Sequence, residues 1–249
     1  MKKITGIVIA RNEEALIGDC LDSLAFCDEL LLVDNDSSDK TVEIAEAKGA
    51  KVIRVTGSGF ARIRNEARRH ISSEWILYVD ADERVSKDLE REIRGILSKE
   101  AVRQNAFRLP RVNFYLGNNR WPKVEHLERL FKTSCLKEWY GELHESPSIV
   151  GEIGDLKHPV FHYTHRDLSS MVKKTLVWSD VEARLRLEAG HPPMYWWRFP
   201  RVMMGTFFDW YILQGGWKAG TVGIIESLYQ SFSIFITYAK LWELQKKKK

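Results

Sequence analysis

The sequence predicts an α/β protein whose mostly parallel central sheet is covered by helices on both faces. Short apolar runs alternate with amphipathic stretches over residues 4–80, and this β-α-β order is typical of such sheets. The run 75–79 is entirely apolar or aromatic and leads directly into Asp80 and Asp82. We therefore expect a buried central strand that ends at a polar rim.

The composition limits the class of protein. A length of 249 residues with 44% hydrophobic residues fits one large domain, with or without an appendage. Lys and Arg exceed Asp and Glu by only four, 38 against 34, which is too mild an excess to indicate nucleic-acid binding. The three cysteines form no CxxC pair and indicate a reducing cytoplasm rather than disulfides or a zinc site. The apolar stretch 4–10 is too short for a secretory signal.

We expect four strands and three helices in the N-terminal half. The strands are 4–10, 29–33, 51–55 and 75–79, and the helices are 13–25, 39–48 and 61–70. Further along, the pattern predicts strands at 106–116 and 127–132, with a turn at 117–119.

Charged residues are concentrated at the carboxyl ends of the predicted strands. Parallel pairing brings the carboxyl ends of these strands to one rim, where open α/β sheets bind ligands. The charged residues at this rim are Arg11, Glu13, Asp34, Asp36, Asp80 and Asp82. A carboxylate after the second strand is suited to ribose hydroxyls or a base N–H, which makes Asp34 a candidate nucleoside ligand.

Asp80 and Asp82 form an Asp-x-Asp pair that can hold a divalent cation. Carboxylates two residues apart on an extended tip point the same way, and Mg²⁺ or Mn²⁺ binds one or two of them together with phosphate oxygens. The alternative is a polar turn, because Asp is common where strands end. The GxGxxG and GxxxxGK[ST] patterns are both absent, so a bound diphosphate would need a metal or basic side chains.

Four successive motifs resemble those of family 2 glycosyltransferases with the GT-A fold. They are Ile9-Ala-Arg-Asn-Glu-Glu, Val33-Asp-Asn-Asp-Ser-Ser-Asp-Lys-Thr, Gly59-Phe-Ala-Arg-Ile-Arg-Asn and Tyr78-Val-Asp-Ala-Asp-Glu. The resemblance implies a Rossmann-like GT-A fold, a nucleotide-diphosphate sugar donor and an inverting transfer. It implies Asp82 as the more direct ligand of Mg²⁺ or Mn²⁺, with Asp80 beside it. The residues that it implies for nucleotide-sugar binding are Arg11, Glu13, Asp34, Arg64, Asn65 and Asp80.

A further resemblance covers the middle of the chain. Arg129-Leu-Phe and Trp139-Tyr-Gly-Glu-Leu-His-Glu resemble the subset of family 2 enzymes that add glucose to the lipopolysaccharide inner core. A direct displacement needs a base for the attacking hydroxyl, and this resemblance implies Glu145 in that role. It implies that His144 assists with the metal or diphosphate, and the alternative is a structural histidine. Glu145 could instead brace the loop around Trp139 or pair with Arg129.

We divide the chain into three parts. Residues 1–105 are the nucleotide-sugar-binding half of a GT-A domain, 106–166 are its acceptor and catalytic half, and 167–249 are a helical C-terminal region. Within the second part, His162 and His165 are expected to be structural, although their spacing leaves a diphosphate contact open.

The C-terminal region is rich in aromatic residues but interrupted by charges. Asp167 is expected to cap a helix that ends at Ala189, before Gly190. Beyond residue 193, no charge-free run approaches the roughly 20 residues that span a bilayer. Apolar residues at helical spacing, together with Trp, Tyr and basic side chains, predict a membrane-surface region. The alternatives are a helical hairpin packed on the protein's own sheet, or a dimer interface.

The residues and the resemblances together predict an inverting glycosyltransferase that is peripheral on the cytoplasmic face of the inner membrane. It would move a hexose, with UDP-glucose as the first choice of donor, onto a lipid-linked saccharide such as heptose of the lipopolysaccharide core. Transfer to a polyprenyl phosphate or a capsule intermediate is the alternative within this class. A catalytically silent, membrane-associated binding module is the alternative outside it. The sequence indicates no oligomeric state.

Overall fold

The computed structural model describes residues 2–57, 59–141 and 145–247, and the chain divides into two compact units. Unit 1 consists of residues 1–112 and 125–162, and unit 2 of residues 113–124 and 163–249. The strands that end at the predicted rim lie in unit 1. The helices of the predicted C-terminal region lie in unit 2.

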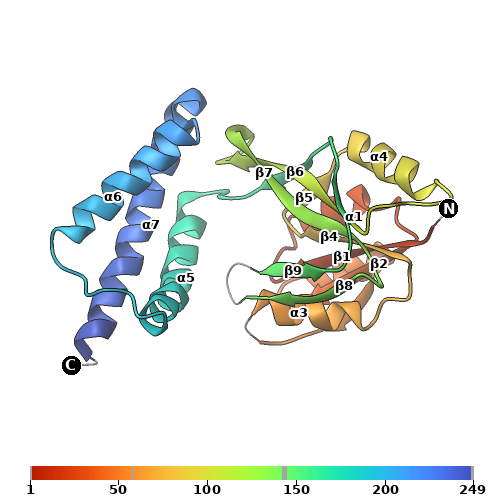
Figure 1. Cartoon of the computed structure of the whole chain (residues 1–249), viewed down its shortest axis with the longest axis horizontal. Coiled ribbons are helices and arrows are strands. Elements are labelled where there is room, and N and C mark those ends of the chain that lie inside the picture. The colour runs from red at the N-terminus through yellow and green to blue at the C-terminus, as the bar shows by residue number, and fades with distance from the viewer. Residues whose placement is uncertain (1, 58, 142–144, 248–249) are drawn as a thin grey trace. The chain divides into compact units, whose positions relative to one another are not determined.

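Unit 1 begins with the alternation of strands and helices that the sequence predicts (Figure 1). The strands are β1 (Ile4–Ala10), β2 (Glu29–Asp34), β3 (Lys51–Arg54) and β4 (Trp75–Asp80), and the helices between them are α1 (Ile17–Ser23), α2 (Thr41–Ala47) and α3 (Phe60–Arg68). The four strands pair in the order β3-β2-β1-β4 and are all parallel. The carboxyl ends of β1, β2 and β4 therefore share one rim, as predicted.

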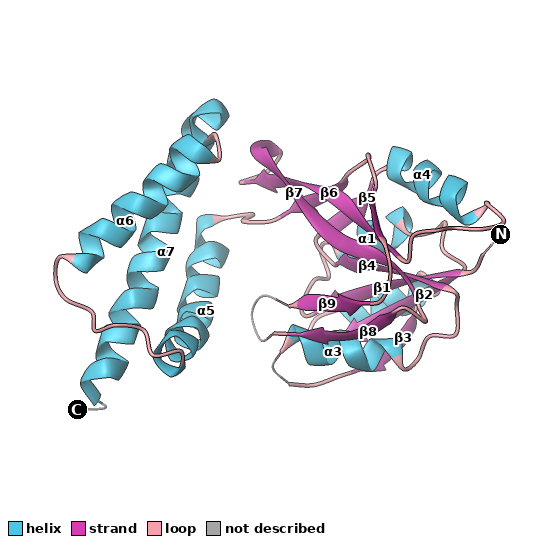
Figure 2. Ribbon diagram, in the orientation of Figure 1, coloured by secondary structure: helices cyan, strands magenta, loops and turns pink. Residues whose placement is uncertain are grey.

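Strands from later in the chain extend the sheet beyond β4. They are β5 (Glu83–Val85), β6 (Ala106–Tyr115), β7 (Asn119–Lys132), β10 (Ile153–Asp155) and β11 (Val160–Tyr163). Over the described residues the sheet has the order β3-β2-β1-β4-β7-β6-β11-β5, with β10 beside β6. β7 is antiparallel to β4, and β11 is antiparallel to β5. A separate antiparallel pair consists of β8 (Leu136–Tyr140) and β9 (Ser146–Ile149). The predicted α/β architecture, a large and mostly parallel central sheet with helices packed on it, is confirmed (Figure 2).

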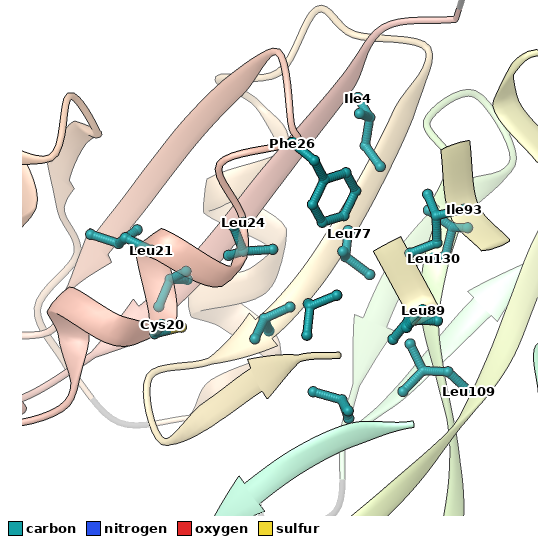
Figure 3. Packing of buried hydrophobic residues seen from close by; sticks show 14 of the residues in the cluster. Ile4, Cys20, Leu21, Leu24, Phe26, Leu77, Leu89, Ile93, Leu109 and Leu130 are labelled. Carbon is teal, nitrogen blue, oxygen red and sulfur yellow. The ribbon is translucent and has the colours of Figure 1, made fainter. Parts of the chain in front are cut away.

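Both faces of the parallel strands are covered, because alternate side chains of each strand point to opposite sides. On one face, Ile4 and Leu77 join side chains of α1, α2 and α4 (Lys87–Leu97) in a buried cluster. Figure 3 shows this cluster around Leu77. On the other face, Ile76 and Tyr78 pack with α3 and β8. Every residue of β1 is buried, as expected of a strand covered from both sides.

Three local features differ from the sequence-based expectations. α1 begins at Ile17 rather than at residue 13, because Asn12 adopts a left-handed φ of 56° and turns follow it. α4 was not expected, although Ser86 caps it by accepting a hydrogen bond from the Leu89 N–H at 3.2 Å. β7 begins at Asn119, well before residue 127, because its neighbour in the sheet is the long strand β6.

Unit 2 is mainly helical. Its helices are α5 (Leu168–Glu188), α6 (Arg198–Phe208) and α7 (Gly220–Lys247), with a π-helical segment η1 (Asp209–Leu213) and a 3₁₀ turn η2 (Gly216–Ala219) between the last two. The predicted cap of α5 is confirmed, because Asp167 accepts a hydrogen bond from the Ser170 N–H at 2.8 Å. α7 lies between α5 and α6 and packs against both (Figures 1 and 2). In the described part of the chain, no helix combines the length and the apolar character needed to cross a membrane.

The side chain of Asn65 fastens the β8–β9 pair to α3. Its amide donates to the Trp139 carbonyl at 2.8 Å and accepts from the Trp139 N–H at 2.7 Å. The Trp139 ring is buried, with its centroid 5.2 Å from that of Tyr78 and 5.6 Å from that of Phe131. Asn65 therefore holds Trp139 in place, and the position beside the nucleoside that the family resemblance implies stays a prediction.

We expect Asn65→Ala to lower the free energy of unfolding by about 1–3 kcal/mol, because it leaves buried backbone groups of Trp139 without partners. Urea titration monitored by circular dichroism measures this change. Asn118→Ala, in the exposed turn before β7, is the control and should change stability by less than about 0.5 kcal/mol. An Asn65→Ala protein of normal stability that binds UDP weakly would contradict the structural role.

Candidate active site

Hydrogen bonds join the loops after β1 and β2 into one surface. The Asn12 N–H donates to Ser37 Oγ at 3.0 Å, and Asn12 Oδ1 accepts from the Ser38 N–H at 2.8 Å. The Glu13 N–H donates to Thr41 Oγ1 at 2.8 Å. The first two predicted rim segments therefore lie side by side, as the parallel-strand argument requires.

Asp34 ends β2 and is nearly inaccessible, with 2% of its side chain exposed. Its Oδ1 accepts from the Ser37 N–H at 3.1 Å, and its Oδ2 lies 3.9 Å from Arg54 Nε. Arg11 is exposed and Glu13 is half-buried at the same rim. The structure brings these residues together, and their contact with a nucleoside stays a prediction.

Asp80 ends β4 between two buried arginines. Arg64 Nη2 donates to Asp80 Oδ1 at 2.9 Å, and Arg129 Nη2 donates to Asp80 Oδ2 at 2.8 Å. Burial by itself would raise the pKa of Asp80, but the guanidiniums of Arg129 and Arg64 outweigh it and hold the pKa well below its usual range. Asp80 is therefore a permanent carboxylate with both oxygens hydrogen-bonded.

Arg64, on α3, joins Asp80 to the predicted base. Its Nη2 and Nε donate to Glu145 Oε1 at 3.1 Å and 3.2 Å, so one guanidinium holds both carboxylates. The Arg64 side chain is 2% exposed, and its Cζ lies 4.8 Å from the centre of the Trp139 ring. Its Nη1 has no hydrogen-bond partner among the described residues.

The hydroxyl of Tyr78 supports the backbone of Arg64. It donates to the Arg64 carbonyl at 3.1 Å. Burial, partly offset by the nearby Arg64 charge, raises the pKa of Tyr78 to about 12, so the phenol keeps its proton at neutral pH. The position of Arg64 is therefore fixed from both its side chain and its main chain.

Arg129 contributes more to the site than the sequence analysis recognised. The sequence places it in the Arg129-Leu-Phe motif and offers it as an alternative partner of Glu145, whereas in the structure it bonds Asp80 and lies 3.7 Å from Glu83. Arg111 approaches Glu83 at 3.3 Å. The sequence of β7 offers no clear signal for this role, because the strand contains other charged residues, such as Arg120 and Glu128. His144, predicted to assist with the diphosphate or metal, lies outside the described residues.

Asp82 lies next to His162 of β11. The His162 Nε2 is 3.3 Å from Asp82 Oδ2. The antiparallel register of β11 and β5 pairs His162 with Glu83, which brings the imidazole to the acidic motif. A structural role was the first expectation for His162, and the structure places it beside Asp82 of the predicted site.

Asp82 and His162 fit a divalent metal that substrate phosphates also bind. Mg²⁺ commonly takes one or two carboxylates plus phosphate oxygens, and imidazole is a common metal ligand. No group of three or more His, Cys, Asp or Glu side chains suited to a metal occurs in the described residues. A metal site whose remaining ligands are substrate phosphates needs fewer than three such protein side chains. Both oxygens of Asp80 are already bonded to arginines, which favours Asp82 as the more direct ligand, and the metal roles of both residues stay predictions.

Comparison with known proteins finds glycosyltransferases that align along most of the chain. The family model described as Glycosyl transferase family 2 matches residues 5–148. An uncharacterized glycosyltransferase of Rickettsia typhi is 28% identical over 266 residues, covering 99% of this chain and 89% of the relative. The lipopolysaccharide core biosynthesis glycosyltransferase LpsC of Rhizobium meliloti is 24% identical over 257 residues, covering 96% and 92%.

A solved structure supports the same fold. The structure of S. aureus TarS residues 1–349, in complex with UDP-GlcNAc, has a TM-score of 0.51 and 15% identity, covering 99% of this chain and 92% of that one. The family match spans more than half of the chain and includes the Asp-x-Asp motif and Glu145. The chain belongs to glycosyl transferase family 2.

Proposed function

We propose that the protein transfers a hexose, with glucose from UDP-glucose as the first choice, onto a lipid-linked saccharide such as heptose of the lipopolysaccharide core, with inversion at the anomeric carbon. The observation that carries this proposal is the Arg64 bridge, which holds Asp80 and Glu145 in one cluster. A carboxylate next to the Asp-x-Asp motif can act as base on an acceptor hydroxyl while the donor diphosphate lies at the rim.

The choice of acceptor rests on similarity to LpsC over nearly the full length of both chains. LpsC is described as a lipopolysaccharide core enzyme, and we extend that substrate class to this chain. Transfer to a polyprenyl phosphate or a capsule intermediate is the alternative acceptor chemistry. A catalytically silent binding module is the alternative outside enzymes. The presence of Asp82, Glu145 and Arg64 in one region favours catalysis over that alternative.

In the proposed reaction Glu145 takes the proton of the attacking hydroxyl, and Arg64 orients the carboxylate of Glu145. Asp34, Glu13 and Arg11 bind the nucleoside end of the donor. The other residues bind and orient the substrates at the rim, and Glu145 alone transfers a proton.

Asp82 and His162 would hold the Mg²⁺ or Mn²⁺. When bound, the metal supplies positive charge that stabilises the departing diphosphate. In this proposal Asp80 holds Arg64 and Arg129 in position and does not bind the metal. Of the two aspartates that the sequence predicts at the metal, only Asp82 is then a direct ligand.

We further propose that the enzyme works peripherally on the cytoplasmic face of the inner membrane. A lipid-linked acceptor is confined to the bilayer, and a nucleotide sugar is made in the cytoplasm. The reacting groups must therefore meet at that surface.

Glu145→Gln tests the base. It keeps the size and hydrogen bonding of the side chain but cannot take a proton, so we expect kcat to fall about 10²–10⁴-fold with donor affinity nearly unchanged. Steady-state transfer assays and calorimetric titration of UDP-glucose measure the two quantities. The matched control is Glu138→Gln, an exposed carboxylate of β8, which should retain activity.

Normal transfer by a folded Glu145→Gln protein would remove Glu145 from the mechanism, and Glu142 would be the next candidate. Absence of donor turnover by the unmodified protein, over long incubation with Mg²⁺ and acceptor, would favour the silent binding module.

Asp82→Asn tests the metal. We expect at least a tenfold loss of kcat/KM, and loss of the increase in UDP affinity that Mg²⁺ or Mn²⁺ gives the unmodified protein. His162→Gln should act in the same direction, whereas Asp155→Asn, an exposed carboxylate of β10, should have no effect. Full activity of the unmodified protein in excess chelator would contradict metal dependence.

A further inference from the structure

In α5 and α7 of unit 2, most buried side chains are small or polar, and several large apolar side chains are exposed. The buried residues are Met171, Thr175, Ser179 and Ala183 in α5, and Gly223, Glu226, Ser227, Ser231, Thr237 and Leu241 in α7. The exposed apolar residues of the same helices include Leu168, Val172, Leu176, Leu228, Phe232 and Trp242. A helix of a water-soluble domain normally presents its apolar stripe to the core, so this arrangement is reversed.

Hydrogen bonds hold the seam between α5 and α7. Thr175 Oγ1 lies 2.8 Å from the Tyr229 hydroxyl, which also donates to the Met171 carbonyl at 2.8 Å. Farther along, Thr237 Oγ1 donates to Glu182 Oε2 at 3.4 Å. Small residues at every fourth position with interhelical hydrogen bonds are the packing mode of helices in an apolar solvent.

The arrangement of the helices leaves large apolar side chains uncovered. α7 lies between α5 and α6, so the three helices form a layer (Figure 2). In the described residues, the buried apolar cluster of this helical region consists of Ala183, Met194 and Leu241, with Leu187, Phe199, Tyr238 and Leu244 partly buried against it. Burial within unit 2 therefore does not account for the large apolar side chains.

Exposed tryptophans of unit 2 stand beside basic side chains. Trp196 is 82% exposed, and the Lys246 Nζ lies 5.7 Å from the centre of the exposed Trp242 ring. The Lys218 Nζ lies 5.3 Å from the centre of the Trp217 ring. Tryptophan partitions to the level of lipid head groups, and the long basic side chains reach the phosphates there.

The excess positive charge of the chain lies in residues 167–249, and four of these positive charges belong to the lysine run 246–249. Residues 167–249 contain twelve Lys and Arg against seven Asp and Glu, a net charge of +5, whereas residues 1–166 contain 26 against 27, a net charge of −1. Two copies facing each other through this region would bring like charges together, which disfavours a dimer. An anionic surface complements the charge.

We propose that unit 2 docks on an anionic lipid bilayer, with the exposed apolar side chains of α5, α6 and α7 among the outer parts of the acyl chains and the basic side chains at the phosphates. This rests on the membrane location in the proposed function and deepens it by naming the lipid chemistry and the contacting residues.

Flotation of the purified full-length protein with phosphatidylglycerol–phosphatidylethanolamine vesicles tests the proposal. We expect binding at low salt, release in part by high salt, and weak binding to phosphatidylcholine vesicles. Arg201→Glu with Lys218→Glu should weaken binding more than tenfold, because each basic residue near an anionic surface contributes roughly fivefold. Trp196→Ala should weaken it independently of salt.

The control is the same charge reversal in unit 1, at the exposed Lys51 and Lys157, which should leave vesicle binding unchanged. Melting temperatures verify that each variant is folded. Equal binding to phosphatidylcholine, or equal loss with the control pair, would overturn the proposal. The proposal would also be overturned if the protein did not bind vesicles and instead formed a dimer that Trp196→Ala dissociates.

A parallel assay separates this proposal from the proposed function. Transfer to a water-soluble, lipid-free core oligosaccharide does not require the bilayer, so the Arg201→Glu and Lys218→Glu protein should retain it. Vesicle binding without any transfer would sink the proposed reaction alone. Transfer without vesicle binding would sink the docking proposal alone.

Discussion

The buried guanidinium of Arg64 is the interaction on which the site depends. It projects from α3, bonds Asp80 at the end of the central strand β4, and bonds Glu145 just before β9. A helix, a strand and a hairpin are thereby fixed at one point. Removing one member of a buried ionic group leaves an uncompensated charge, which costs roughly 3–5 kcal/mol. The aromatic rings of Trp139 and Tyr78 beside Arg64 exclude water, so the geometry of the two carboxylates follows from the packing of the core.

The N-terminal half could be predicted because its information is local. Apolar runs with helices between them determine a parallel sheet, and parallel strands bring Asp34 and Asp80 to the same rim. The positions of Arg129 and His162 could not be predicted, because they depend on antiparallel pairing between segments far apart in the chain. A register shift of one residue would turn each side chain to the opposite face of the sheet. The start of α1 was misjudged for a different reason, namely the left-handed backbone at Asn12, which the periodicity of the apolar residues does not reveal.

Apolar side chains are buried in the strands of unit 1, whereas many of the buried side chains of α7 in unit 2 are polar or small. This difference connects the fold to the proposed chemistry. In unit 1 the apolar residues of β1 and β4 are inside, and the charged groups meet ligands at a rim. In unit 2 the periodicity of α7 could be recognised in the sequence, but periodicity does not state which face is buried. The structure shows Glu226 and Thr237 buried, with Leu228 and Phe232 outside. An enzyme that joins a water-soluble donor to a lipid-linked acceptor needs contact with both water and the lipid bilayer.

The measurement that tests the central claim most directly is a double-mutant cycle between Arg64 and Glu145, read out as the rate of glycosyl transfer. Arg64→Lys keeps the charge but loses the planar fork that holds two carboxylates. If Arg64 acts by orienting Glu145, the double variant Arg64→Lys with Glu145→Gln should be no slower than the slower single variant. Rate losses that multiply, each variant reducing the rate by its own full factor in the presence of the other, would show that the two residues act independently and would contradict the account.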